Sequence, residues 1–204
     1  MQRQISCKIK TIMNLNELRD KAYKCACEHG FHDTEYPYYH WLMLTICELS
    51  EAIEADRNDR HADRDMFEKT MKDLIREDDS DKDIIFYSYF KKYIKDTVED
   101  ELADVVIRLL DFSGLESIDL TDLNTEIEED LEPGIQNQLR DMTKALFTCC
   151  NVLTSFVFDL DEIAKTTLSG IFQYAKAAGI DLKWHIEQKM RFNELRPYLN
   201  GKKY

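Results

Sequence analysis

Glycine and proline are scarce in this chain, which has 6 glycines and 3 prolines among 204 residues. An all-β sandwich or barrel needs many tight turns, and those turns normally draw on both residue types. Hydrophobic residues make up 44% of the chain and charged residues 33%, a globular rather than a disordered composition. The sequence therefore predicts an all-α fold, and its length suits a single domain over residues 1–204.

Helix start and stop signals divide the chain into segments. Asn14 or Asn16 can cap a first helix that ends near Glu28, just before Gly30. The pair at 133–134, Pro-Gly, marks a turn. The remaining predicted helices are 38–56, 66–77, 84–94, 96–112 (stopped near Gly114), 119–130 as a short helix or loop, 136–158, 161–178, and a last helix that Asp181 caps and that ends near Leu195.

Charge and cysteine usage exclude several classes of protein. The net charge is −13, and no cluster of Lys and Arg is long enough to form the basic face of a nucleic-acid binder. No run approaches 18 apolar residues, and the first residues lack a signal-like apolar stretch, so we expect neither a membrane segment nor a signal peptide. The six cysteines contain no C-x-x-C pair, and we interpret them as reduced thiols of a cytoplasmic protein.

Two pairs of acids differ from the others because they lie inside apolar helical runs. Glu48 and Glu51 occur in HWLMLTICELSEAIEA, and Glu101 and Asp104 occur in EDELADVVIRLL. An i, i+3 spacing places the two members of each pair on one helix face. Other acid pairs at this spacing have polar surroundings and are better explained as solvated helix faces. We therefore predict that these four carboxylates are buried or half-buried.

Buried carboxylates must be compensated, because an unpaired one either takes up a proton or destabilises the fold. Arg108 is the basic residue on these faces. Mg²⁺ prefers oxygen ligands and shares them with substrate phosphates, so we predict that the two acidic faces meet around Mg²⁺, with Mn²⁺ as a substitute. The alternative is a set of buried salt bridges to Lys or Arg from elsewhere. A di-iron bundle is disfavoured, because no histidine has a glutamate three residues before it.

At these acids the chain resembles the MazG-like, all-α nucleoside triphosphate pyrophosphohydrolases, whose signature is E-x-x-E on one helix and E-x-x-D on a later one. Residues 29–33, HGFHD, are similar to a segment ahead of the family's first acidic helix. Residues 179–198 resemble its closing helix, with a K-x-x-x-N-x-x-R-P pattern at Lys189, Asn193, Arg196 and Pro197. Segments 57–95 and 115–178 are then insertions into a MazG-like helical bundle.

The resemblance implies hydrolysis of a nucleoside or deoxynucleoside triphosphate to the monophosphate and pyrophosphate, as in house-cleaning of nucleotide pools. The implied partners are the nucleotide and further copies of the chain, in a homodimer or homotetramer. The implied metal ligands are Glu48, Glu51, Glu101 and Asp104, with Glu48 also accepting a proton from the attacking water. The implied substrate-binding residues are Lys189 and Arg196 for phosphate charge, Asn193 for phosphate or sugar, and Tyr36 and Trp41 for the base.

Two interpretations of function stay open. The first is the enzyme, which the intact set of four acids favours. The alternative is a catalytically silent helical module that binds a nucleotide or a partner protein. On general grounds Tyr36 and Trp41 are more often core residues, and Lys189 and Arg196 are more often part of a solvated C-terminal turn.

Overall fold

The computed structural model describes residues 13–74, 80–128, 131 and 133–201, and every regular element in these ranges is helical. The all-α prediction is therefore confirmed. The elements are α1 (Leu15–Glu28), α2 (Tyr38–Arg57), α3 (Arg64–Leu74), α4 (Lys82–Tyr93), α5 (Val98–Leu115), α6 (Thr121–Glu128), α7 (Pro133–Leu139), α8 (Met142–Leu153), α9 (Leu160–Ala178), α10 (Leu182–Glu194) and a terminal 3-10 turn, η1 (Tyr198–Gly201). None of the described helices is both long and apolar enough to cross a membrane.

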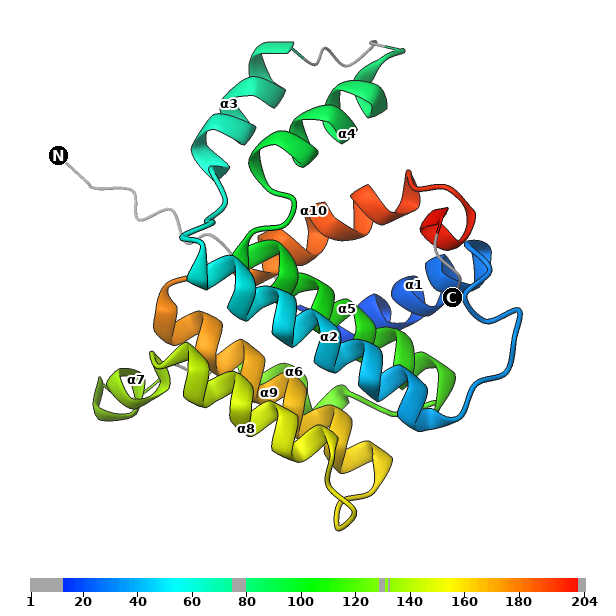
Figure 1. The fold of residues 1–204 in the computed structure, drawn as a ribbon, viewed down its shortest axis with the longest axis vertical. Helices are drawn as coiled ribbons and strands as arrows, with labels where there is room; N and C mark the ends of the chain where they lie inside the picture. Colours follow the sequence, from blue (N-terminus) through cyan, green and yellow to red (C-terminus); the bar gives the residue numbers. More distant parts are fainter. Residues whose placement is uncertain (1–12, 75–79, 129–130, 132, 202–204) are drawn as a thin grey trace, which may run out of the picture.

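Helix α5 lies at the centre of the bundle, with α2 alongside it and α1, α9 and α10 against its other sides (Figure 1). A helix enclosed in this way needs apolar residues around most of its circumference, which explains the continuous run in its sequence. Ala52 and Ala55 are small, fully buried residues on the face of α2 that carries Glu48, and they let α2 pack closely against the bundle. This close pairing brings the two predicted acidic segments side by side.

The hairpin of α3 and α4 extends away from the main bundle (Figure 1). It has a small aromatic core of its own, which it shares with α10: Phe67, Phe86, Phe90, Ile94 and Phe192. This hairpin makes up most of segment 57–95, which the resemblance marks as an insertion. Its chain returns to the bundle directly at the start of α5.

Helices α6 to α9 occupy the other segment, 115–178, and α8 and α9 form a hairpin against α2 and α5 (Figure 1). A reciprocal capping box of Asp159 and Glu162 begins α9, and Gly179, at φ +79, ends it in the left-handed region. Asp181 then caps α10 by accepting a hydrogen bond from the backbone N–H of Trp184. These ends agree closely with the predicted ones.

Three predicted boundaries were wrong. The single helix predicted over 136–158 is divided, because Asp141 caps a new helix by accepting from the backbone N–H of Lys144 at 3.0 Å. Pro133 begins α7 instead of marking a turn, a position where its missing N–H has no cost. Helix α5 also continues through Gly114, where a Cβ atom would lie 2.5 Å from that of Tyr23. Glycine is thus needed there for the close approach of α1.

Candidate metal centre

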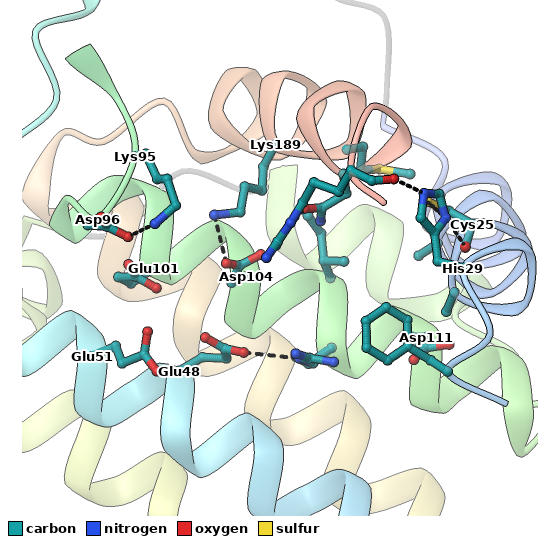
Figure 2. Close-up of a pocket in the computed structure, with 18 residues that line it drawn as sticks. Cys25, His29, Glu48, Glu51, Lys95, Asp96, Glu101, Asp104, Asp111 and Lys189 are labelled. Carbon is teal, nitrogen blue, oxygen red and sulfur yellow. Dashed lines mark hydrogen bonds and ion pairs between the residues drawn. The ribbon is translucent and has the colours of Figure 1, made fainter. Parts of the chain in front are cut away.

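Three of the four predicted metal ligands converge where α2 and α5 lie side by side. One carboxylate oxygen from each of Glu48, Glu101 and Asp104 lies within 4.8 Å of the others. Glu51, one turn further along α2, is exposed and lines the same space without joining this group (Figure 2). The predicted meeting of the two acidic faces is thus present, with Glu51 at its edge.

Glu101 is the most unusual member of this group. The residue is only 4% exposed, its carboxyl has no hydrogen-bond or ion-pair partner within the described part of the chain, and its oxygens face the cleft. Burial, and then the neighbouring Asp104, raise its pKa to about 8. Burial and Asp104 also raise the pKa of Glu48, although Arg108 acts in the opposite direction. The surroundings of this group therefore do not offset the negative charge of all its carboxylates, and the protonated form is favoured while no cation is bound.

The salt-bridge alternative is realised for two of the acids. The Arg108 Nε donates to Glu48 at 3.0 Å. The Lys189 Nζ lies 2.7 Å from an oxygen of Asp104 and 2.7 Å from one of Asp100. Burial alone would lower the pKa of Lys189, but the two aspartates raise it. Both lysine and arginine are thus held charged by the acids beside them.

The charges do not balance at this point of the bundle. Five carboxyls meet the buried Lys189 and the half-buried Arg108 there: Glu48, Glu51, Asp100, Glu101 and Asp104. A set of carboxylate oxygens with an uncompensated charge suits a hard divalent cation such as Mg²⁺. The residues present therefore fit the predicted metal.

The acidic group forms one end of a cleft of about 910 Å³ that opens to solvent. The other end lies between α1, α5 and α10, where an apolar surface meets a few polar side chains. The apolar residues are Ala22, Cys25, Ala26, Phe31, Ile107 and Met190, and the polar ones are His29, Asp111, Asn193 and Arg196. A ligand with a charged end and an apolar end would match this division.

The closing-helix residues line this cleft, but Lys189 differs from both expectations for it. It is 2% exposed, so it is not part of a solvated terminal turn. Two of its three donor positions serve Asp100 and Asp104, so its charge neutralises the protein's own acids. Asn193 accepts a hydrogen bond from Arg196 at 3.4 Å, and both remain candidates for substrate contact.

The predicted base-pocket residues lie elsewhere. Trp41 is 5% exposed and packs on the ring of His32, with centroids 4.6 Å apart. Tyr36 stacks on His40 at 4.2 Å. Neither Tyr36 nor Trp41 lines the cleft, so a base pocket built from them has no support in this arrangement. The core interpretation describes Trp41 better.

Sequence reasoning missed two buried acids next to the centre. Asp100 is 1% exposed and holds Lys189, and its position inside the same apolar run was the available signal. Asp111 pairs with His32 Nε2 at 2.7 Å, which anchors the loop between α1 and α2. Burial raises the pKa of Asp111, while His32 and Arg108 oppose the rise. No sequence spacing linked Asp111 to His32.

Comparisons with protein-family models, curated proteins and solved structures found no match to this chain. The resemblance to MazG-like enzymes therefore stays a prediction that rests on the acid pairs and the two flanking motifs.

Proposed function

We propose that the chain is a Mg²⁺-dependent nucleoside triphosphate pyrophosphohydrolase that releases pyrophosphate and a nucleoside monophosphate. The observation that carries the proposal is the convergence of Glu48, Glu101 and Asp104, with Glu101 buried and lacking a partner among the described residues. A purely structural cluster would be expected to pair each buried acid. Here the unpaired acid lies at the end of an open cleft.

In this proposal Glu48, Glu101 and Asp104 hold Mg²⁺, with Glu51 beside them. When bound, the ion would offset the charge of phosphate oxygens and lower the pKa of a water molecule. Glu48 would also accept a proton from the attacking water, which is the role that the resemblance implies for it. Arg108 holds one oxygen of Glu48 and so orients that carboxylate.

Residues at the other end of the cleft bind and orient the substrate. Arg196 and Asn193 offer a guanidinium and an amide to phosphate or sugar oxygens. The apolar surfaces of Ala22, Ala26 and Met190 exclude water from the neutral part of the nucleotide. House-cleaning of nucleotide pools, a cytoplasmic location and assembly into dimers or tetramers remain expectations from the resemblance.

The alternative is a helical module that binds a nucleotide without hydrolysing it. The ion pairs Glu48–Arg108 and Asp104–Lys189 favour it, because they already satisfy two of the proposed ligands. The enzyme and the binding module would use the same cleft, but the module would not turn over its nucleotide. Only the enzyme should release pyrophosphate.

A pyrophosphate-release screen with Mg²⁺ across common and modified triphosphates tests the proposal. We expect release from at least one triphosphate, and a loss of at least about 100-fold in Asp104→Ala and Glu51→Ala, since both disturb charge stabilisation at the reacting phosphates. Circular dichroism should show that both variants keep their helical signal. Near wild-type rates in Asp104→Ala would refute the metal site.

Melting curves distinguish the alternative. A non-hydrolysable triphosphate with Mg²⁺ should raise the melting temperature of either an enzyme or a binding module. A clear rise, together with no pyrophosphate release from any triphosphate, would replace the enzyme by the module.

A further inference from the structure

The connection between α4 and α5 places one more cation at the acidic end of the cleft. Only Ile94, Lys95, Asp96 and Thr97 separate the two helices. Ile94 is buried in the aromatic core of the hairpin, and Thr97 caps α5 by accepting from the backbone N–H of Asp100. Lys95 and Asp96 line the cleft, and the Lys95 side chain extends toward the space that Glu101 and Lys189 also face (Figure 2).

The backbone of this connection is held in an uncommon conformation. Asp96 has a φ of +62, in the left-handed region that residues other than glycine seldom adopt. Its N–H donates to Asp100 at 3.1 Å, and the same Asp100 oxygen accepts from Lys189 at 2.7 Å. The hydroxyl of Thr97 donates to the carbonyl of Ile94 at 2.7 Å. The connection is thus tied to the buried centre, and it presents Lys95 at a defined place.

The other cations of the cleft are engaged differently. Lys189 is buried between two aspartates, and Arg108 is bound to Glu48. Arg196 belongs to the end of the cleft that α1 and α10 form. Lys95 pairs with its neighbour Asp96, and both side chains are partly exposed, at 29% and 53%. An exposed pair of this kind is weak, so a phosphate group can replace Asp96 as the partner of Lys95.

We propose that Lys95 is a polyphosphate ligand, which the inserted hairpin supplies to the site. This inference rests on the proposed function and names the part of the substrate that this residue contacts. Because the apolar lining lies at the opposite end of the cleft, Lys95 contacts the phosphates that leave as pyrophosphate. Segment 57–95 then has a functional role, because Lys95, at the end of the segment and just before α5, completes the anion site.

Calorimetric titration with inorganic pyrophosphate in the presence of Mg²⁺ tests this role without requiring turnover. We expect Lys95→Met to bind pyrophosphate about tenfold more weakly than the wild type, because a charge-assisted contact is lost. Lys91→Met is the matched control, since Lys91 is an exposed lysine of the same hairpin that does not line the cleft. It should stay within about twofold, because solvent and salt screen its charge. Lys95→Arg should recover most of the affinity.

Wild-type affinity in Lys95→Met, an equal loss in Lys91→Met, or no pyrophosphate binding by the wild-type protein would each overturn the inference. Circular dichroism of Lys95→Met checks that the helices are intact, and Lys95→Arg supplies a second variant that keeps the charge. The outcomes separate the two proposals. Binding that depends on Lys95 without hydrolysis of any triphosphate rejects the enzyme alone, whereas hydrolysis with an unaffected Lys95→Met variant rejects the role of Lys95 alone.

Discussion

Two cavities of the molecule differ sharply in the chemistry of their walls. The acidic cleft of about 910 Å³ contains buried carboxyls, a buried lysine and a buried acid without a described partner. A groove of about 1180 Å³ lies between α8 and α9 and reaches α6 and α7. Its charged residues, among them Asp122 and Lys144, lie at its exposed rim, and its buried lining is uncharged, as at Cys149 and Ser169.

The difference shows that volume is a poor guide to function in this molecule. A charge taken out of water lowers stability unless a partner compensates it. The groove avoids that cost by keeping its charges in solvent, whereas the acidic cleft retains Glu101 in spite of it. The larger cavity is therefore the weaker candidate for a chemical site.

The largest expected effect on stability comes from replacing the buried Lys189. Lys189→Met leaves Asp100 and Asp104 without their cation, so we expect a loss of about 3 to 5 kcal/mol in the free energy of unfolding. The matched change in the groove is Lys165→Met, which removes a partly exposed pair with Asp161 and should cost at most about 1 kcal/mol. Urea unfolding at neutral pH measures both.

A much larger loss in Lys189→Met would show that the main role of Lys189 is to stabilise the fold and not to bind substrate. Equal losses in Lys189→Met and Lys165→Met would contradict it, because the buried position would then have no special cost. A weaker substrate affinity with unchanged stability would restore the phosphate-binding role that the resemblance implies.

Replacing Glu101, the acid without a described partner, should have a smaller effect and should stabilise the protein. In EDTA at pH 8, Glu101→Gln should raise the free energy of unfolding by roughly 1 to 3 kcal/mol, since it removes a buried group that titrates at a cost. Asp122→Asn, at the exposed rim of the groove, should change it by less than about 0.5 kcal/mol. Glu101→Gln should also remove any rise in melting temperature that Mg²⁺ produces.

The sign of the pH dependence follows from the pKa of Glu101, about 8 in the folded protein against 4.5 for the unperturbed group. Between these values the folded state holds a proton that the unfolded state releases. The contribution of Glu101 to the stability of the metal-free wild type should therefore fall as the pH rises from about 4.5 to about 8. The difference in the free energy of unfolding between the wild type and Glu101→Gln should widen over the same pH interval. A constant difference would show that Glu101 titrates normally.

The smallest effect is expected in the groove itself. Gly170 lies within α9, and a Cβ atom there would be 3.3 Å from the sulfur of Cys149. Gly170→Ala gains about 0.5 to 1 kcal/mol from reduced backbone freedom, partly offset by that tight contact, so a thermal melt should show little net change. Pyrophosphate release should be unaffected. A large loss of activity in Gly170→Ala would contradict the contrast between the two cavities, because it would show that the groove has a functional role.

The sequence alone determined the helical class, most helix ends and the identity of the acids. Side-chain caps such as Asp159 and Asp181, and the stop at Gly179, act over a few residues, so their effect can be predicted locally. The apolar surroundings of Glu48 and Glu101 likewise follow from helical periodicity. The break between α7 and α8 escaped prediction, because the residues around it favour helix on both sides.

Only the tertiary structure decided which charges meet. Lys189 and Asp100 are separated by 89 residues, and His32 and Asp111 by 79, so no spacing rule connects them. The same holds for Lys95, which reaches the cleft only because the α3–α4 hairpin closes against α10 and returns to α5. Helix formation depends on neighbours within a turn or two, whereas burial and ion pairing depend on distant segments that packing brings together.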